Sequence, residues 1–343
     1  MRGNFIPCNT WNSTRVNNTE VLLPNLSPKE YSLVKSENKN LDFSYEKFSF
    51  SNELTETLKA FTNLSLDFVS TKENSLNKIV SLELNEENNQ LVDIIKIKAE
   101  ENSTLNLALD YFSKEDVKGF RHTIIEVEAE ENSNVKIFLS QRFSLDILSI
   151  QSVYYKVKKN ANVEFIQVDL GSKENYLSYI GELAEKEANV SINSIYFGKN
   201  NQKLDFNYVA NQIGRATNYD LSIKGALADR AQKTCRATID FKRGSSISKG
   251  SEQEYVTLLS DDIRNVAVPI LLCTEDDVEG LHAASAGKID EDILFYIMSR
   301  GFSETEAKRL ILESKFAETI DLIDNEEIRK RVYTTLSKKL SEV

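Results

Sequence analysis

The densest group of residues that could do chemistry lies near the C-terminus, where four acids precede a histidine. Glu275, Asp276, Asp277 and Glu279 come shortly before His282, one of only two histidines in the chain. Neutral imidazole is a common metal ligand and the usual proton shuttle near neutral pH. A complete catalytic or metal site needs a nucleophile, an orienting acid or further ligands, and the spacing here matches no metal motif. Three roles are therefore open for His282: a chemical role, packing in the core, or contact with a partner protein.

Neither the three cysteines nor the Gly-Lys pair near His282 indicates a complete metal or phosphate site within this chain. Cys8, Cys235 and Cys273 are widely spaced without a CxxC motif, which argues against a disulfide framework or a conventional zinc site. Cys235 lies in the strand-like segment "KTCRATIDF" and is most simply a small buried hydrophobe. Gly287-Lys288 lacks the upstream glycine and the hydroxyl residue of a phosphate-binding loop.

Composition excludes several classes of protein. The 343-residue chain is 41% hydrophobic and 28% charged, with a net charge of −11. This charge argues against a nucleic-acid or anionic-membrane binder, since both need a basic face. The longest apolar run, 266–273, is too short to span a bilayer, and residues 1–16 lack the apolar core of a signal peptide. We therefore expect a cytoplasmic protein.

An internal repeat runs through the middle of the chain. "AEENSTLNL" (99–107) returns as "AEENSNVKI" (129–137), with weaker copies at 158–166 and 185–193. The first apolar residues after each polar turn are Leu105, Val135, Val163 and Val190. A spacing of about 30 residues is typical of a repeated supersecondary unit.

The repeat predicts a mainly β protein built as a parallel β-helix. Each copy has alternating strands around its turn and no helical spacing. Three strands of about five residues with three short turns would fill one coil, and stacked coils would bury a continuous apolar core. A β-sandwich is the rival, but it does not explain the regular spacing.

Composition and patterning divide the chain into three parts. Residues 1–75 form a loose N-terminal arm with a short helix near "NELTETLKAF", residues 76–275 the β-helix core, and residues 276–343 a helical domain. In the last part, acids and a terminal glycine delimit a helix at 290–301. Ser303 and Glu306 form a capping box for a second helix with Ala307, Leu310, Ile311 and Ser314 on one face. A third helix is expected at about 325–340.

The segment from His282 to Met298 predicts an interaction surface. "HAASAG" (282–287) lets another backbone approach closely, and "ILFYIM" (293–298) places six apolar residues in a row. One stripe of a single helix can pack inward, so the rest must be covered by something else. A large uncovered apolar patch usually marks a protein partner.

These residues also carry a family resemblance. "DDVEGLHAASAGKIDEDILFYIMSRGFSETEA", "CRATIDFKRGSS" and "EQEYVTLLSDDIRNVAVPILLCTEDDVEG" resemble the C-terminal part of the SufB/SufD family, the scaffold subunits of SUF iron–sulfur cluster assembly. "HAASAGKID" and "LFYIMSRG" are closest to the SufD branch, since SufB reads more like "HEATTS" at the first of them. The resemblance is strong over about 205–320, architectural in the repeat region and weak in the N-terminal arm.

The resemblance implies a right-handed parallel β-helix and a complex with SufB and the ABC-type ATPase SufC. The β-helix end would pair with SufB, or with a second copy of this chain if it is a SufB-like homodimer. The C-terminal helices would dock the ATPase, through Phe295, Tyr296, Met298, Arg300, Gly301 and Ala307. The partner would hydrolyse ATP, so this chain would be a scaffold without turnover. A carbohydrate-active β-helix is a distant alternative, since such proteins are typically secreted.

The resemblance also implies a role for His282 as a ligand of the transient cluster at the interface between the scaffolds. Many SufD proteins carry cysteine two residues before this histidine, where this chain has Gly280. A cysteine ligand would then come from the partner or from Cys273 or Cys235. Flavin binding stays open.

Overall fold

The computed structural model describes residues 1–10, 12–35, 50–51, 54, 59–114 and 116–342. The short helix expected near 52–61 falls mostly outside the described residues. None of the helices in the described ranges is long and apolar enough to span a membrane.

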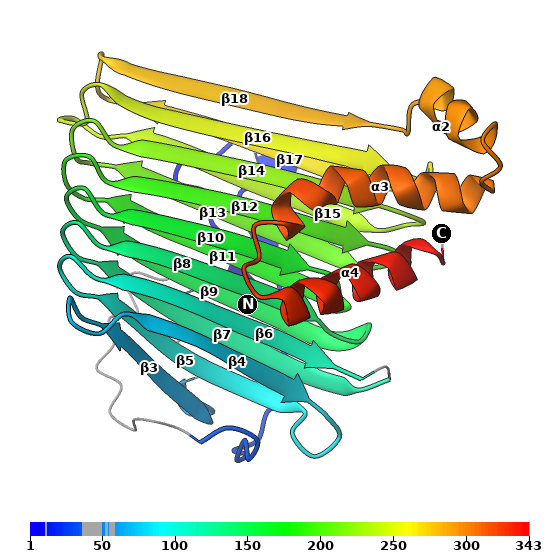
Figure 1. The fold of residues 1–343 in the computed structure, drawn as a ribbon, viewed down its shortest axis with the longest axis horizontal. Helices are drawn as coiled ribbons and strands as arrows, with labels where there is room; N and C mark the ends of the chain where they lie inside the picture. The colour runs from blue at the N-terminus through cyan, green and yellow to red at the C-terminus, as the bar shows by residue number, and fades with distance from the viewer. Residues whose placement is uncertain (11, 36–49, 52–53, 55–58, 115, 343) are drawn as a thin grey trace.

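Two parallel eight-stranded sheets face each other and form a β-solenoid of about eight coils (Figure 1). We call them the odd sheet and the even sheet, after their strand numbers. The odd sheet contains β3 (Leu64–Ser70), β5 (Gln90–Ala99), β7 (Lys118–Ala129), β9 (Asp146–Val157), β11 (Glu174–Leu183), β13 (Lys203–Gln212), β15 (Gln232–Phe241) and β17 (Arg264–Cys273). The even sheet contains β4 (Leu76–Leu84), β6 (Thr104–Ser113), β8 (Asn134–Arg142), β10 (Asn162–Asp169), β12 (Asn189–Gly198), β14 (Asn218–Leu227), β16 (Ser248–Leu258) and β18 (Val278–Gly287).

The register of the even sheet confirms the repeat found in the sequence. Leu105 pairs with Val135, Val135 with Val163, and Val163 with Val190. The same column continues to Tyr219 and Gly250, where the sequence similarity is lost. Each repeat is therefore one coil, and the solenoid extends beyond the recognisable copies.

The expectation of three short strands per coil is wrong. Each coil has two long strands, and β11, β12 and β13, for example, have 10 residues each. Alternating segments such as "KLDFNYVANQ" contain no turn residue that would divide them, so two long strands and two turns fill the period. Solenoid strands extend from Leu64 to Gly287, on both sides of the expected 76–275 range. The small-residue run 282–287 therefore lies in β18 and not beside a helix.

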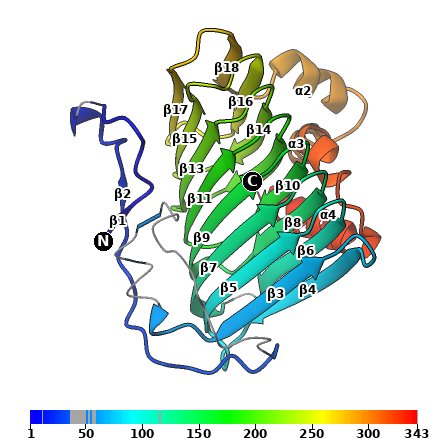
Figure 2. The ribbon, with the colours of Figure 1, turned by 90° about the vertical axis from the view of Figure 1, so that its left-hand side faces the viewer.

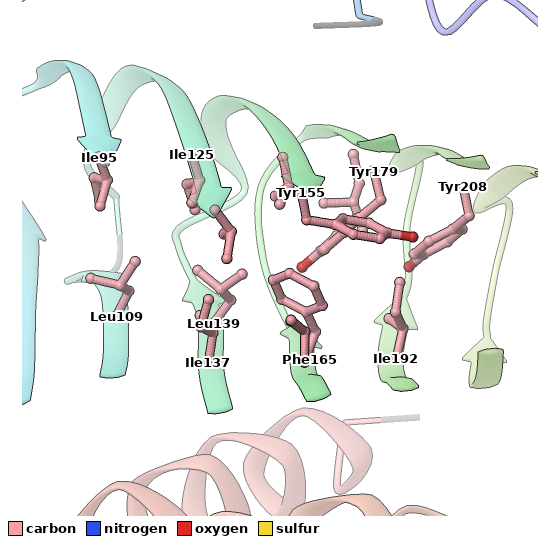
Figure 3. Packing of buried hydrophobic residues seen from close by; sticks show 14 of the residues in the cluster. Ile95, Leu109, Ile125, Ile137, Leu139, Tyr155, Phe165, Tyr179, Ile192 and Tyr208 are labelled. Carbon is pink, nitrogen blue, oxygen red and sulfur yellow. The ribbon is translucent and has the colours of Figure 1, made fainter. Parts of the chain in front are cut away.

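The space between the sheets is filled by aliphatic side chains near the N-terminal end and by aromatic rings further along (Figure 3). The register column of Ile95 and Ile125 continues to Tyr179 and Tyr208 in later coils, and Phe165 follows Ile137 in the even sheet. The ring centroids of Tyr155 and Phe165 lie 5.4 Å apart, and those of Phe165 and Tyr179 lie 5.2 Å apart. These tilted and edge-to-face contacts add to the burial energy of the large rings.

In six successive coils, from the β5–β6 turn to the β15–β16 turn, the turn from the odd to the even sheet contains a residue in the left-handed conformation. Asn102, Asn132 and Asn160 occupy it with φ of 58°, 58° and 52°, and their N–H groups donate to the next coil. Asparagine tolerates this region better than most residues. In the last such turn the position is Ile247, with φ of 56°, where a β-branched side chain is strained.

We therefore expect Ile247→Asn to raise the free energy of unfolding by about 1 kcal/mol, because it relieves this strain. Urea denaturation measures the change. Ile79 in β4 is the matched control, since it is 46% exposed, against 45% for Ile247, but lies in an ordinary strand. Ile79→Asn should be neutral or destabilising, and an equal gain in both variants would contradict the strain argument.

Three helices follow the solenoid. They are α2 (Glu291–Met298), α3 (Glu304–Ile320) and α4 (Glu326–Leu340). The predicted capping box of Ser303 and Glu306 is present. Figure 1 shows α3 and α4 lying across the even sheet, whereas α2 stands beyond its end. Leu312, Phe316, Val332 and Leu336 pack on outward-facing residues of β8 to β14, which anchors α3 and α4.

The N-terminal arm covers the outer face of the odd sheet (Figure 2). It contains β1 (Arg2–Gly3), β2 (Thr19–Glu20) and the 3-10 helix η1 (Asn12–Thr14). The Asn4 side chain donates to Asp205 Oδ1 at 2.7 Å, and the Arg236 guanidinium donates to Val16 O. Both side chains are buried, so the arm is tied to the middle of the sheet.

Candidate functional site

The C-terminal end of the solenoid presents two strands that each pair on one side. β17 is the last strand of the odd sheet and β18 the last strand of the even sheet. The outer edge of such a strand offers backbone donors and acceptors to another chain. Leu271 on β17 and Leu281 on β18 are exposed large hydrophobic residues at this end. Within the described chain, the end coil therefore leaves two strand edges and two large apolar side chains uncovered.

His282 lies on β18, and a hydrogen bond connects it to the preceding coil of the even sheet. Its register partner is Glu252 on β16, and His282 Nδ1 lies 3.0 Å from Glu252 Oε2. The Glu252 side chain is 6% exposed, whereas His282 retains 24% exposure. None of the described residues bonds His282 Nε2. One ring nitrogen is thus oriented by the protein and the other is available for a ligand.

Three more groups surround this pair, and we call Lys233, Cys235, Glu252, Glu254 and His282 the end-coil cluster. Lys233 Nζ contacts Glu254 Oε1 at 2.6 Å, and both side chains are buried. Lys233 also donates to the backbone oxygen of Val266 in β17 at 3.1 Å. The cluster therefore joins both sheets of the last coils.

Burial sets the protonation states in the cluster. Desolvation, followed by the charge of Glu254, raises the pKa of Glu252 to about 8. Desolvation lowers the pKa of His282. A neutral Glu252 beside a neutral imidazole fits both directions better than an ion pair. With the imidazole proton on Nδ1 and donated to Glu252 Oε2, His282 Nε2 keeps its lone pair for a ligand. Burial and the Glu254 carboxylate also raise the pKa of Cys235 well above its usual value, so this thiol stays protonated.

The structure separates the two candidate thiols. Cys235 is buried, on β15, within electrostatic reach of Glu252 and Glu254. Cys273 is exposed at the C-terminal end of β17, where its Sγ donates to Glu275 O at 2.9 Å. At Gly280 a Cβ atom would lie 2.9 Å from a Leu271 methyl group, so a larger residue there would require Leu271 to move. Only Cys235 is brought into the end-coil cluster.

The end-coil cluster does not complete a metal site from the described residues of this chain. Within the described ranges, no group of three or more histidine, cysteine or acidic residues could hold a metal ion. His282 can supply one nitrogen ligand, and Glu252 can orient it. A metal or cluster bound here would need its other ligands from outside this chain.

Sequence reasoning missed Lys233, Glu252 and Glu254. The signal was present in "SKGSEQEYVTL", where Glu252 and Glu254 fall on the same face of the strand as Gly250 and Val256. Those positions face the interior, so two acids on the same face indicated a buried polar cluster. The acids that drew attention, Glu275 to Glu279, do not contact His282.

Helix α2 carries three of the six residues expected to contact the ATPase, Phe295, Tyr296 and Met298. Phe295 is 73% exposed and Tyr296 58%, and Ile293 and Met298 are exposed as well. We call the exposed side chains of Ile293, Phe295, Tyr296, Met298 and Phe302 the α2 surface. The Arg300 guanidinium stacks 5.0 Å from the Tyr296 ring centroid, and Gly301 takes φ of 99° just past the helix. Ala307 is fully buried in α3 and does not lie on this surface.

Comparison with known proteins assigns the family. Residues 82–315, about two thirds of the chain, match the family model described as SUF system FeS cluster assembly, SufBD core domain. The chain belongs to the SufBD family. The matched region includes the end-coil cluster. The family match leaves no support for the carbohydrate-active interpretation.

Curated members of the SufBD family show the range of similarity. The iron–sulfur cluster assembly protein SufD of Bacillus subtilis is 29% identical over 43% of this chain and 34% of its own length. A SufBD family protein of Pyrococcus horikoshii is 29% identical over 46% of this chain and 35% of its own. One from Mycobacterium leprae is 23% identical over 57% of this chain and 52% of its own. The matches thus span about a third to about half of these relatives.

Proposed function

We propose that this SufBD family chain is a SufD-like scaffold that pairs through its end coil with a SufB-like scaffold or with a second copy of itself. The observation that carries this proposal is that the open edges of β17 and β18 and the incomplete end-coil cluster occur at the same end. A partner strand added there would bring further ligands beside His282. The transient iron–sulfur cluster is cargo, and this chain contributes His282 to its assembly site.

A SufC-like ATPase would dock on the α2 surface. The helix buries none of its residues in this chain, and large exposed apolar patches usually mark protein interfaces. Aromatic side chains such as Phe295 and Tyr296 are typical of residues that dominate binding energy. ATP would be hydrolysed by that partner alone, so the scaffold itself performs no turnover.

The test is co-purification with the ATPase and the second scaffold. Tyr296→Asp places a charge in the apolar interface and should weaken ATPase binding about tenfold or more. The variant should still fold and pair with the other scaffold, because α2 lies away from the strands of the solenoid core. Size-exclusion chromatography and quantitative pull-down measure both contacts.

Leu22→Asp is the matched control, since Leu22 is 87% exposed in the N-terminal arm, far from α2. It introduces the same charge without touching the α2 surface and should leave both contacts intact. Unchanged ATPase binding in Tyr296→Asp would contradict docking on α2. A stable monomer in the presence of both partners would contradict the scaffold proposal.

A further inference from the structure

A polar cavity of about 650 Å³ lies between the N-terminal arm and the outer face of the odd sheet. The arm segment from Asn12 to Glu20 forms one wall, and β13, β15 and the start of β17 form the other. Figure 2 shows this segment standing alongside the strands of the odd sheet. The cavity is on the outside of the solenoid and separate from the end-coil cluster.

The cavity is strongly basic although the chain is acidic overall. Two carboxylates, Glu20 and Asp205, lie in its wall together with five cations. The cations are Arg2, Arg15, Lys203, Arg236 and Arg264. The wall therefore has an excess of three positive charges in a chain of net charge −11. Positive charges concentrated in a cavity raise the local concentration of anions.

The two carboxylates are already neutralised. Arg236 Nη1 contacts Asp205 Oδ1 at 2.8 Å with both side chains buried, and Arg2 contacts Glu20 at 3.1 Å. The first pair lies within the odd sheet and the second within the arm, so neither carboxylate is left to balance the remaining cations.

Three cations in the wall have no carboxylate partner in the described part of the chain. Lys203 Nζ donates only to neutral acceptors, Glu20 O and Tyr176 Oη, each at 3.0 Å. Arg15 and Arg264 are exposed, and neither forms an ion pair with a described residue. They come from the arm, β13 and β17, so they approach the cavity from different sides.

We propose that this cavity binds a small molecule carrying a diphosphate group. Planar guanidinium groups match phosphate oxygens with paired hydrogen bonds, and three unpaired cations match the charge of a diphosphate. Gln232 and Thr234 add neutral hydrogen-bonding groups to the wall. The volume falls in the range of small-molecule sites and leaves room for a nucleoside as well as a free diphosphate.

Isothermal titration calorimetry of the full chain at roughly physiological ionic strength tests the proposal. The probes are inorganic pyrophosphate, ADP and adenosine. We expect saturable binding of pyrophosphate that weakens with added salt, and about tenfold weaker binding in Arg15→Gln/Arg264→Gln. Tighter binding of ADP than of pyrophosphate would identify a nucleotide as the ligand, and equal binding a free diphosphate.

Arg243→Gln is the matched control, because Arg243 is an exposed arginine beyond the opposite end of β15. It should bind pyrophosphate as the wild type does. Circular dichroism of all variants checks that the fold is retained. The proposal is overturned if neither pyrophosphate nor ADP saturates the chain up to about 1 mM, if adenosine binds as well as ADP, or if the double variant binds like the control.

Discussion

Gly181→Ala should lower the free energy of unfolding by about 3 kcal/mol. Gly181 on β11 pairs in register with Tyr155 on β9, and the Tyr155 ring lies over the position that a Cβ atom would occupy. The ring is fully buried and packs on Phe165, so it has no space to move into (Figure 3). Adding one methyl group would force the aromatic column apart, and urea denaturation measures the cost.

Gly287→Ala is the matched control for this variant. Gly287 also lies in a solenoid strand, but nothing approaches the position of its Cβ within 4 Å. Its substitution should change stability by less than about 0.5 kcal/mol. A similar loss of stability in the two variants would contradict the close packing of the Tyr155 ring over Gly181. A double variant with Tyr155→Leu should recover part of the loss, because the ring is then absent.

Glu252→Gln should make the chain more stable than the wild type at pH 8 and should have less effect at pH 5. The pKa of Glu252 is about 8 in the folded state, above its ordinary value of 4.5. An acid with a raised folded pKa stabilises the fold below its unfolded pKa, and the contribution is lost as pH rises through the folded pKa. Between pH 5 and pH 8 this loss amounts to about 3 kcal/mol. Glutamine cannot ionise, so the variant should not show it.

The difference between the wild-type and variant stability curves isolates Glu252 from other groups that titrate. The titratable groups around it are His282 on β18, Glu254 on β16, Lys233 and Cys235 on β15, and Tyr219 on β14. Glu279→Gln is the control, because Glu279 is exposed on β18 and contacts Lys249 at the surface. Its curve should run parallel to that of the wild type. A parallel curve for Glu252→Gln would contradict the buried, protonated state of Glu252.

Much of the fold could be predicted from the sequence because each coil repeats one local rule. The anchors Leu105, Val135, Val163 and Val190 follow the same polar turn, and strand pairing keeps them in register. Capping residues such as Ser303 act within one turn of helix. The start of α3 could therefore be predicted from the sequence as well. The number of strands per coil could not, because the period fixes the total length and not how it is divided.

The candidate site was harder to predict because its contacts join residues about one coil apart. His282 is 30 residues from Glu252, and only the parallel register brings them together. The acids adjacent to His282 in sequence lie on a turn and the exposed start of β18. The basic cavity depends on the N-terminal arm, which follows no repeat, so its position over β13 and β15 required the structure.

The central claim, that His282 supplies a ligand at a site shared between scaffolds, is tested most directly by bound iron. This chain would be co-expressed anaerobically with its SufB-like and SufC-like partners, as wild type and as His282→Ala. Glu279→Ala is the control, because Glu279 is an exposed residue of the same strand that contacts Lys249 at the surface. The account predicts complexes of equal size, with iron reduced several-fold in His282→Ala alone. Equal iron in all three complexes would contradict it.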